Sequence, residues 1–309
     1  MSSGRHLARA RRAFTPPTSQ RALRMCGAAL GALALSMLLA STALAKSPKG
    51  NFAVFVQCPT ATATTCFYMS ATGGEFRLHK ETITMTNKVV VQGGIEVNAK
   101  TGAETFIAAS NGETLSKTPQ PLPGGLTGLL NCREITNLLE RELCEEEFEG
   151  GHTAVNVIAE LAKPASEIGI SKPNFLKDEG VSLKLPLKFR LENPLLGSEC
   201  YIGSSTSPVM VPLTTGTTKP AEPNKPIKGT AGKVEVLEGG TLEKALEASL
   251  VENDFSAPGA SGCGGALYGS FLDPIINEKF GLPAAAGTNT AILKGTVEFA
   301  TAEAVTKSE

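Results

Sequence analysis

Apolar and polar residues alternate along residues 181–192, and this is the clearest pattern in the chain. The odd positions from Val181 to Leu191 are all apolar, whereas the even positions are Ser, Lys, Pro, Lys, Arg and Glu. Because successive side chains of a β-strand point to opposite faces, this pattern predicts a strand with one packed face and one wet face. Pro186 has no N–H to donate, so we expect the strand to lie at a sheet edge or at a bulge.

Shorter β-branched and apolar runs predict the rest of the architecture. Gly-Gly pairs or Asn separate several of them, which is the spacing of a meander. The expected strands are 51–57, 75–78, 82–86, 88–92, 95–98, 105–108, 155–161, 209–213 and 290–300. Residues 111–128 and 214–232 are rich in Pro, Gly and Thr and are expected to be surface loops. The pattern therefore predicts a mainly β fold, an antiparallel sandwich or barrel.

Helical periodicity begins after Asn131. Asn131 and Glu134 have the spacing of a capping box. The apolar residues that follow at helical spacing, and that we expect to pack on the sheet, are Ile135, Leu138, Leu139 and Leu143. The helix is expected to fray within the acidic run 145–149, because negative charge at a helix C-terminus opposes the macrodipole. The carboxylates of this run are consecutive, which favours a solvated surface over a calcium site.

Two later segments have weaker patterns. Residues 265–279 fit a helix that is interrupted near Pro274, since proline removes a helical hydrogen bond. Residues 241–250 fit either a short helix or a strand. We therefore expect one or two short helices beside the sheets.

The first 45 residues differ from the rest of the chain. They contain six arginines and no acidic residue, and residues 25–40 form an apolar run. Ala43 and Ala45 then occupy the positions of an A-x-A cleavage site, which predicts a signal peptide over 1–45 and no stable membrane anchor. Residues 46–309 are expected to be a single, mostly β, secreted domain. In that part 23 basic residues face 30 acidic ones, which argues against a nucleic-acid partner.

Six cysteines remain after the signal peptide, an even number that predicts three disulfides in an exported chain. They are Cys58, Cys66, Cys132, Cys144, Cys200 and Cys263. Fifteen pairings are possible. Cys58 and Cys66 enclose only seven residues and are the first expected pair, and a bridge between Cys200 and Cys263 would staple the C-terminal half. If residues 131–147 formed one continuous helix, a rise of ~1.5 Å per residue would hold Cys132 and Cys144 ~18 Å apart, so their pairing requires a break between them.

Several segments resemble recurring blocks in a family of uncharacterised secreted proteins of actinobacteria. The segments are 58–66 (CPTATATTC), 89–94 (VVVQGG), 191–218, 251–265 and 280–297. The resemblance brings no known activity. It implies an exported protein whose cysteines pair as 58–66, 132–144 and 200–263.

Groups able to do chemistry are few in the mature chain. The histidines are His79 and His152, and the aspartates are Asp178, Asp254 and Asp273. A hydrolytic triad needs a histidine base, and neither histidine has a matching motif. Residues 259–263 (GASGC) lack the last glycine of a nucleophile elbow and fit a turn around a disulfide. No C-x-x-C motif occurs, so no metal or other cofactor is expected.

The sequence favours a secreted non-catalytic β protein that acts as a binding or structural module of the cell envelope or medium. One alternative is an extracellular carrier of a small hydrophobic ligand, and another is a secreted hydrolase with an unrecognised site. Tryptophan is absent and only three tyrosines occur, which counts against a sugar site with aromatic platforms. A closed apolar cavity of several hundred Å3, on the order of known ligand sites, would favour the carrier.

Overall fold

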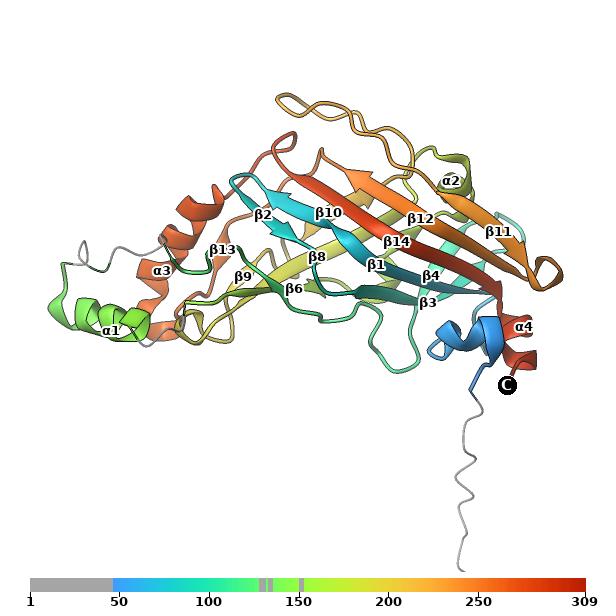
Figure 1. Ribbon diagram of the computed structural model, residues 1–309, viewed down its shortest axis with the longest axis horizontal. Helices are drawn as coiled ribbons and strands as arrows, with labels where there is room; N and C mark the ends of the chain where they lie inside the picture. The colour runs from blue at the N-terminus through green and yellow to red at the C-terminus, as the bar shows by residue number, and fades with distance from the viewer. Residues whose placement is uncertain (1–46, 128–131, 133–135, 150–152) are drawn as a thin grey trace, which may run out of the picture. The chain divides into compact units, whose positions relative to one another are not determined.

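Two antiparallel sheets dominate the computed structural model (Figure 1). The structure describes residues 47–127, 132, 136–149 and 153–309. Sheet A has seven strands in the order β11-β12-β14-β1-β3-β4, with β2 paired to β1. Their bounds are β1 (Thr65–Leu78), β2 (Glu81–Thr84), β3 (Val89–Val97), β4 (Glu104–Ala108), β11 (Lys233–Leu237), β12 (Leu242–Glu252) and β14 (Thr290–Thr301).

Sheet B also has seven strands, in the order β13-β9-β8-β6-β5, with β7 and β10 paired to β8. Their bounds are β5 (Gln120–Pro121), β6 (Asn156–Leu161), β7 (Gly169–Ile170), β8 (Leu183–Glu192), β9 (Tyr201–Ile202), β10 (Val209–Leu213) and β13 (Ala260–Ser261). One cluster of buried side chains draws on both sheets, so the sheets pack face to face. The predicted mainly β, sandwich-like, disulfide-bonded fold is confirmed.

Strand β8 confirms the alternating pattern but not its expected place at an edge. Its apolar positions from Leu183 to Leu191 are buried, whereas Val181, expected on the packed face, is 44% exposed and precedes the strand. Pro186 lies in the middle of the sheet, paired with Met210 of β10. Its carbonyl accepts a hydrogen bond from the Ala162 N–H at 2.8 Å, immediately beyond the end of β6. The hydrogen-bond ladder between β6 and β8 ends at this point, so the missing N–H of Pro186 removes no hydrogen bond from within the ladder.

The expected strand at residues 51–57 is wrong, because this segment forms the 3-10 helix η1 (Gly50–Phe55). Phe52 and Phe55 are buried three residues apart, and side chains at this spacing share one face of a 3-10 helix. In the sequence this period of three is hidden, because the residues between the two phenylalanines are also apolar.

The meander is confirmed with different boundaries. The expected strand 75–78 is the end of β1, which begins ten residues earlier, and the expected strands 88–92 and 95–98 form the single strand β3. Gly93 and Gly94 lie inside β3 and not in a turn. A Cβ on Gly93 would lie 2.4 Å from the Ile107 carbonyl oxygen, so this glycine permits the close approach of β4.

The structure corrects one of the helix predictions and decides between the alternatives left open for residues 241–250. The helix α3 (Gly265–Phe280) continues through Pro274 without the expected interruption. Asp273 and Asn277, on either side of the proline, bond to the backbone of residues 260–263 and hold the helix in place. Residues 241–250 belong to strand β12, and the last strand is followed by α4 (Ala302–Lys307).

The helix α1 (Leu138–Glu149) begins later than Asn131 and continues through the acidic run, so the expected fraying is wrong. Glutamate is a good helix former, and its propensity outweighs the unfavourable end charge here. Leu138 and Leu139 are 64% and 66% exposed and do not pack on a sheet as expected. The predicted capping box and Ile135 lie outside the described residues.

Short helical turns complete the secondary structure. They are η3 (Ala165–Glu167), α2 (Lys172–Lys177), η4 (Pro194–Leu196) and η5 (Glu238–Gly240). The predicted signal peptide lies outside the described residues and stays a prediction. Within the part of the chain that the structure describes, no helix has the length and apolar character needed to cross a membrane.

Candidate functional site

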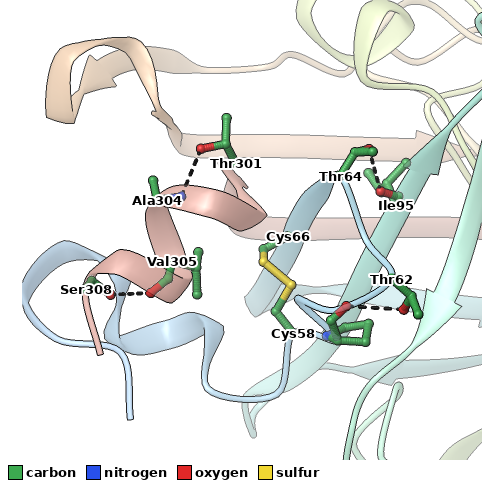
Figure 2. The surroundings of a disulfide bond; sticks show 10 residues. Cys58, Thr62, Thr64, Cys66, Ile95, Thr301, Ala304, Val305 and Ser308 are labelled. Atoms are coloured by element: carbon green, nitrogen blue, oxygen red, sulfur yellow. Dashed lines mark hydrogen bonds between the residues drawn. A yellow bond between two sulfur atoms is a disulfide. The ribbon is translucent and has the colours of Figure 1, made fainter. Parts of the chain in front are cut away.

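The first expected disulfide joins Cys58, which follows η1, to Cys66 near the start of β1 (Figure 2). It lies in a second apolar cluster, on the face of sheet A turned away from sheet B, where η1 and α4 pack. The Lys49 ammonium donates to the Glu309 carbonyl at 2.8 Å, so the N-terminal segment meets the end of the chain at this cluster. The bridge therefore fastens the segment after η1 to the sheet, while α4 is held there by packing.

The second expected disulfide, Cys200–Cys263, is also present and joins the segment before β9 to the turn before α3. Both cysteines are fully buried. Cys132 is disulfide-bonded as well, but the Cys144 side chain lies outside the described residues, so the 132–144 pairing stays a prediction. Because α1 begins at Leu138, the chain between these cysteines is not one continuous helix.

The candidate catalytic residues that the structure describes lie at separate turns. His79 lies in the β1–β2 turn, where its backbone N–H donates to Asn289 Oδ1 at 3.0 Å. The three aspartates accept backbone hydrogen bonds: Asp178 from Ala231, Asp254 from Ala221, and Asp273 from Gly262 and Cys263. No hydrogen bond joins His79 to any of these aspartates, and His152 lies outside the described residues. Among the described residues, His79 and the three aspartates therefore do not come together as a triad.

The turn at residues 259–263 serves the disulfide. Gly262 has φ 79°, and a Cβ there would lie 2.3 Å from the Glu199 carbonyl oxygen. Ser261 belongs to β13, which pairs with β9. The predicted turn interpretation is therefore confirmed. Among the residues that the structure describes, no group of three or more His, Cys, Asp or Glu side chains is placed to hold a metal ion.

Among the described residues, the space between the sheets is mostly filled by side chains. Apolar residues, chiefly of β1, β3, β6 and β8, surround a cavity of about 40 Å3. Leu115 and Gln120, from the expected surface loop 111–128, help to line it and are buried. This volume is far below the several hundred Å3 that a carrier of a small hydrophobic ligand requires.

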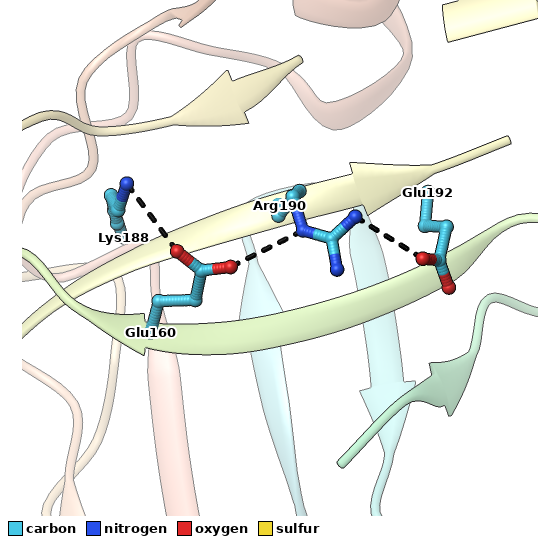
Figure 3. Close-up of polar contacts among 4 residues, drawn as sticks. All are labelled: Glu160, Lys188, Arg190 and Glu192. Carbon is cyan, nitrogen blue, oxygen red and sulfur yellow. Dashed lines mark hydrogen bonds and ion pairs between the residues drawn. The ribbon is translucent and has the colours of Figure 1, made fainter. Parts of the chain in front are cut away.

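A row of charges crosses β6 and β8 on the polar face of sheet B (Figure 3). Glu160 forms ion pairs with Lys188 at 3.4 Å and with Arg190 at 3.2 Å, and Arg190 forms another with Glu192 at 3.1 Å. The Lys188 ammonium lies 3.9 Å from the centre of the Tyr201 ring. Every charge in this row has a partner within the chain, so the row joins the strands and leaves little for a ligand.

One deeply placed carboxylate lies at the end of β12. Glu252 is buried, and its Oε1 accepts hydrogen bonds from the backbone N–H groups of Asn253 and Asp254. Burial raises the pKa of Glu252 above its ordinary value, although these two hydrogen bonds act in the opposite direction. The group caps a turn of its own strand.

A polar depression of about 460 Å3 lies on sheet A, where β1, β14 and β12 run side by side. The side chains that line it are Thr72, Glu247, Ala248, Ser249, Lys294 and Thr296, with Gly73 and Gly295. The sequence analysis missed these residues. Only the Gly-Gly at 73–74 and the Lys-Gly at 294–295 could have indicated irregular strands there.

Comparison of the chain with known protein families, with characterised proteins and with solved structures finds no match. The actinobacterial resemblance therefore stays a prediction based on the quoted segments.

Proposed function

We propose that this chain is a non-catalytic binding module that is exported and acts in the cell envelope or the surrounding medium. The observation that carries the proposal is that its reactive groups lie apart. The three aspartate carboxylates accept backbone hydrogen bonds at separate turns, and His79, in the β1–β2 turn, is hydrogen-bonded to none of them. Among the described residues the space between the sheets holds a cavity of only about 40 Å3, which favours binding on the outer surface.

Export is supported by two independent features. The sequence begins with a basic segment, an apolar run and an A-x-A site, the three parts of a signal peptide. Two disulfides are present in the described part, and such bonds persist in oxidising compartments. Together they favour a place outside the cytosol.

The two other functions have less support. A carrier would need an enclosed apolar cavity roughly ten times larger than the one between the sheets. A hydrolase would need a base and a nucleophile in contact, and no hydrogen bond joins the His79 side chain to a serine, threonine or aspartate of the described residues.

The proposal is tested by sedimentation of the purified mature protein with isolated bacterial cell envelopes. Saturable sedimentation that is unchanged in the His79→Ala variant is expected, because the histidine has no part in binding. Labelling of the folded protein by a fluorophosphonate probe, or a lack of envelope binding at all protein concentrations, would contradict it. The reduced protein serves as the control for folded structure.

A further inference from the structure

Two β-bulges lie at the same level of sheet A, on the strands either side of β14. The register with β1 shifts between Ala71 and Gly73, and the register with β12 shifts between Ala245 and Ala248. Gly295 of β14 is paired with Ala71 on one side and with Ala248 on the other. Bulges bend a strand and redirect its side chains, and they are common beside functional sites. Their coincidence produces the polar depression.

The depression and the strands beside it depend on glycine. A Cβ on Gly295, which lines the depression, would lie 1.9 Å from the Ser70 carbonyl oxygen, and a Cβ on Gly74, next to it on β1, would lie 1.9 Å from that of Ile292. No larger residue fits where these backbones approach each other. The depression is therefore built into the sheet and does not arise from loops.

Glu247 is held at the rim in an unfavourable backbone conformation. Its φ is 58°, in the left-handed region that a residue with a side chain rarely adopts. Such conformations persist where the surrounding structure imposes them and gather at binding and active sites. The conformation places an acidic side chain where glycine would be the easier residue.

The two oppositely charged side chains at the depression, Glu247 and Lys294, form no ion pair with each other. Lys294 lies directly across from Ser249 of β12, and Glu247 lies two residues before Ser249 on that strand. Glu247 and Lys294 are both exposed, and among the described residues neither side chain makes a direct hydrogen bond or ion pair, although Lys233 lies near enough to Glu247 for an electrostatic interaction. This distinguishes the depression from the charged row of sheet B, where Glu160 and Arg190 are paired.

We infer that the depression binds a short zwitterionic peptide, with its ammonium group at Glu247 and its carboxylate at Lys294. The hydroxyls of Thr72, Ser249 and Thr296 can bond to the amide groups between the two ends. The volume of about 460 Å3 falls in the range of small-molecule sites. No aromatic side chain lines the depression, so it offers no platform for a sugar ring. The inference rests on the proposed binding function and gives it a ligand class.

The test uses triglycine as the probe and the mature, disulfide-bonded protein, with binding followed by NMR titration. N-acetyl-triglycine lacks the ammonium group, and triglycine amide lacks the carboxylate. Each blocked peptide is expected to bind roughly three- to fivefold more weakly than triglycine, the effect of losing one exposed ion pair. Shifted resonances are expected at residues 72–73, 247–249 and 294–296.

Two variants assign each charge to its partner. Glu247→Gln should weaken the binding of triglycine by the same factor but leave the binding of N-acetyl-triglycine unchanged. Lys294→Gln should weaken the binding of triglycine and of N-acetyl-triglycine but leave that of triglycine amide unchanged. Glu303→Gln and Lys307→Gln, in the surface pair of α4, are matched controls and should change nothing. Equal losses for all three peptides in either variant would overturn the assignment.

Failure of this inference can be told apart from failure of the proposed function. If triglycine does not bind at millimolar concentration while the protein still sediments with envelopes, the peptide site is wrong and the binding module stands. If neither occurs, both are wrong. Thermal unfolding of each variant confirms that the protein compared is folded.

Discussion

The Asp273 carboxylate of α3 accepts hydrogen bonds from the backbone N–H of Cys263, at 2.8 Å, and of Gly262, at 3.2 Å. The aspartate thereby ties the helix to the turn that carries the Cys200–Cys263 bridge. A carboxylate that satisfies two backbone donors next to a buried disulfide is a structural group. The fold thus uses this carboxylate, one of its few reactive side chains, to hold its own backbone.

Removal of this carboxylate should therefore destabilise the protein. Asp273→Ala leaves two backbone donors without their acceptor and is expected to lower the free energy of unfolding by about 2–3 kcal/mol. Asp254→Ala, which loses a single exposed hydrogen bond to Ala221, is the matched control and should cost about 1 kcal/mol or less. Urea denaturation measures both. Equal effects of the two substitutions would contradict the structural role given to Asp273.

The two observed disulfides should contribute unequally. Cys200–Cys263 spans a sequence separation of 63 and Cys58–Cys66 one of 8. A longer closed loop restricts the unfolded chain more. Replacing Cys200 and Cys263 by alanine should therefore lower the free energy of unfolding by about 4 kcal/mol, and replacing Cys58 and Cys66 should lower it by about 2–3 kcal/mol. Denaturation of the two double variants gives the order, and a larger loss for Cys58→Ala/Cys66→Ala would contradict the loop-length argument.

Glu252 should make stability depend on pH. Burial raises the pKa of this carboxyl in the native state, so near the unfolded value of about 4.3 the native state holds a proton that the unfolded chain has lost. Stability contributed by Glu252 is therefore highest at low pH and falls as the pH rises through the native pKa. Glu252→Gln should flatten this decline in urea midpoints above about pH 4.3. A variant with the same decline as the wild type would show that the burial of Glu252 has no such effect.

Glu104 provides a second test of the same reasoning. Its pKa is also raised, with partial burial as the largest cause, while the Lys172 N–H that bonds to it acts in the opposite direction. Glu104→Gln should therefore flatten the pH dependence in the same sense as Glu252→Gln, and the double variant should be flattest.

The backbone of Glu247 gives a prediction of the opposite sign. At φ 58° glycine avoids the steric cost of a Cβ, so Glu247→Gly should raise the free energy of unfolding by about 1 kcal/mol. Glu235→Gly, in the extended strand β11, should lower it by about 0.5–1 kcal/mol. Differential scanning calorimetry distinguishes the two. Destabilisation by Glu247→Gly would mean that the carboxylate is needed for folding.

The strands with strict alternation could be predicted from sequence. β8 was found because its apolar positions repeat over six pairs of residues, and β10 was found with its observed ends at Val209 and Leu213. The short separation of Cys58 and Cys66 was enough to pair them. In these cases the signal lies within a few neighbouring residues.

The remaining features depend on partners distant in the sequence. Gly93 and Gly94 read as a turn because nothing nearby indicates that β4 packs against Gly93. Pro186 read as an edge residue because the end of β6 opposite it cannot be seen locally. The depression at Gly295 requires a bulge on β1 and another on β12. These bulges lie about 220 and about 50 residues before Gly295 in the sequence. Such sites become visible only when the register of the sheet is known.

We propose that the chain is exported and that its disulfide-bonded sandwich acts through its surface and not through an interior cavity. Mass spectrometry of protein purified from the culture medium of a secreting host tests it most directly, under native and then denaturing conditions. We predict one mass, that of residues 46–309 less six hydrogen atoms, unchanged between the two conditions. Retention of residues 1–45, free thiols, or an additional hydrophobic molecule released on denaturation would contradict the account.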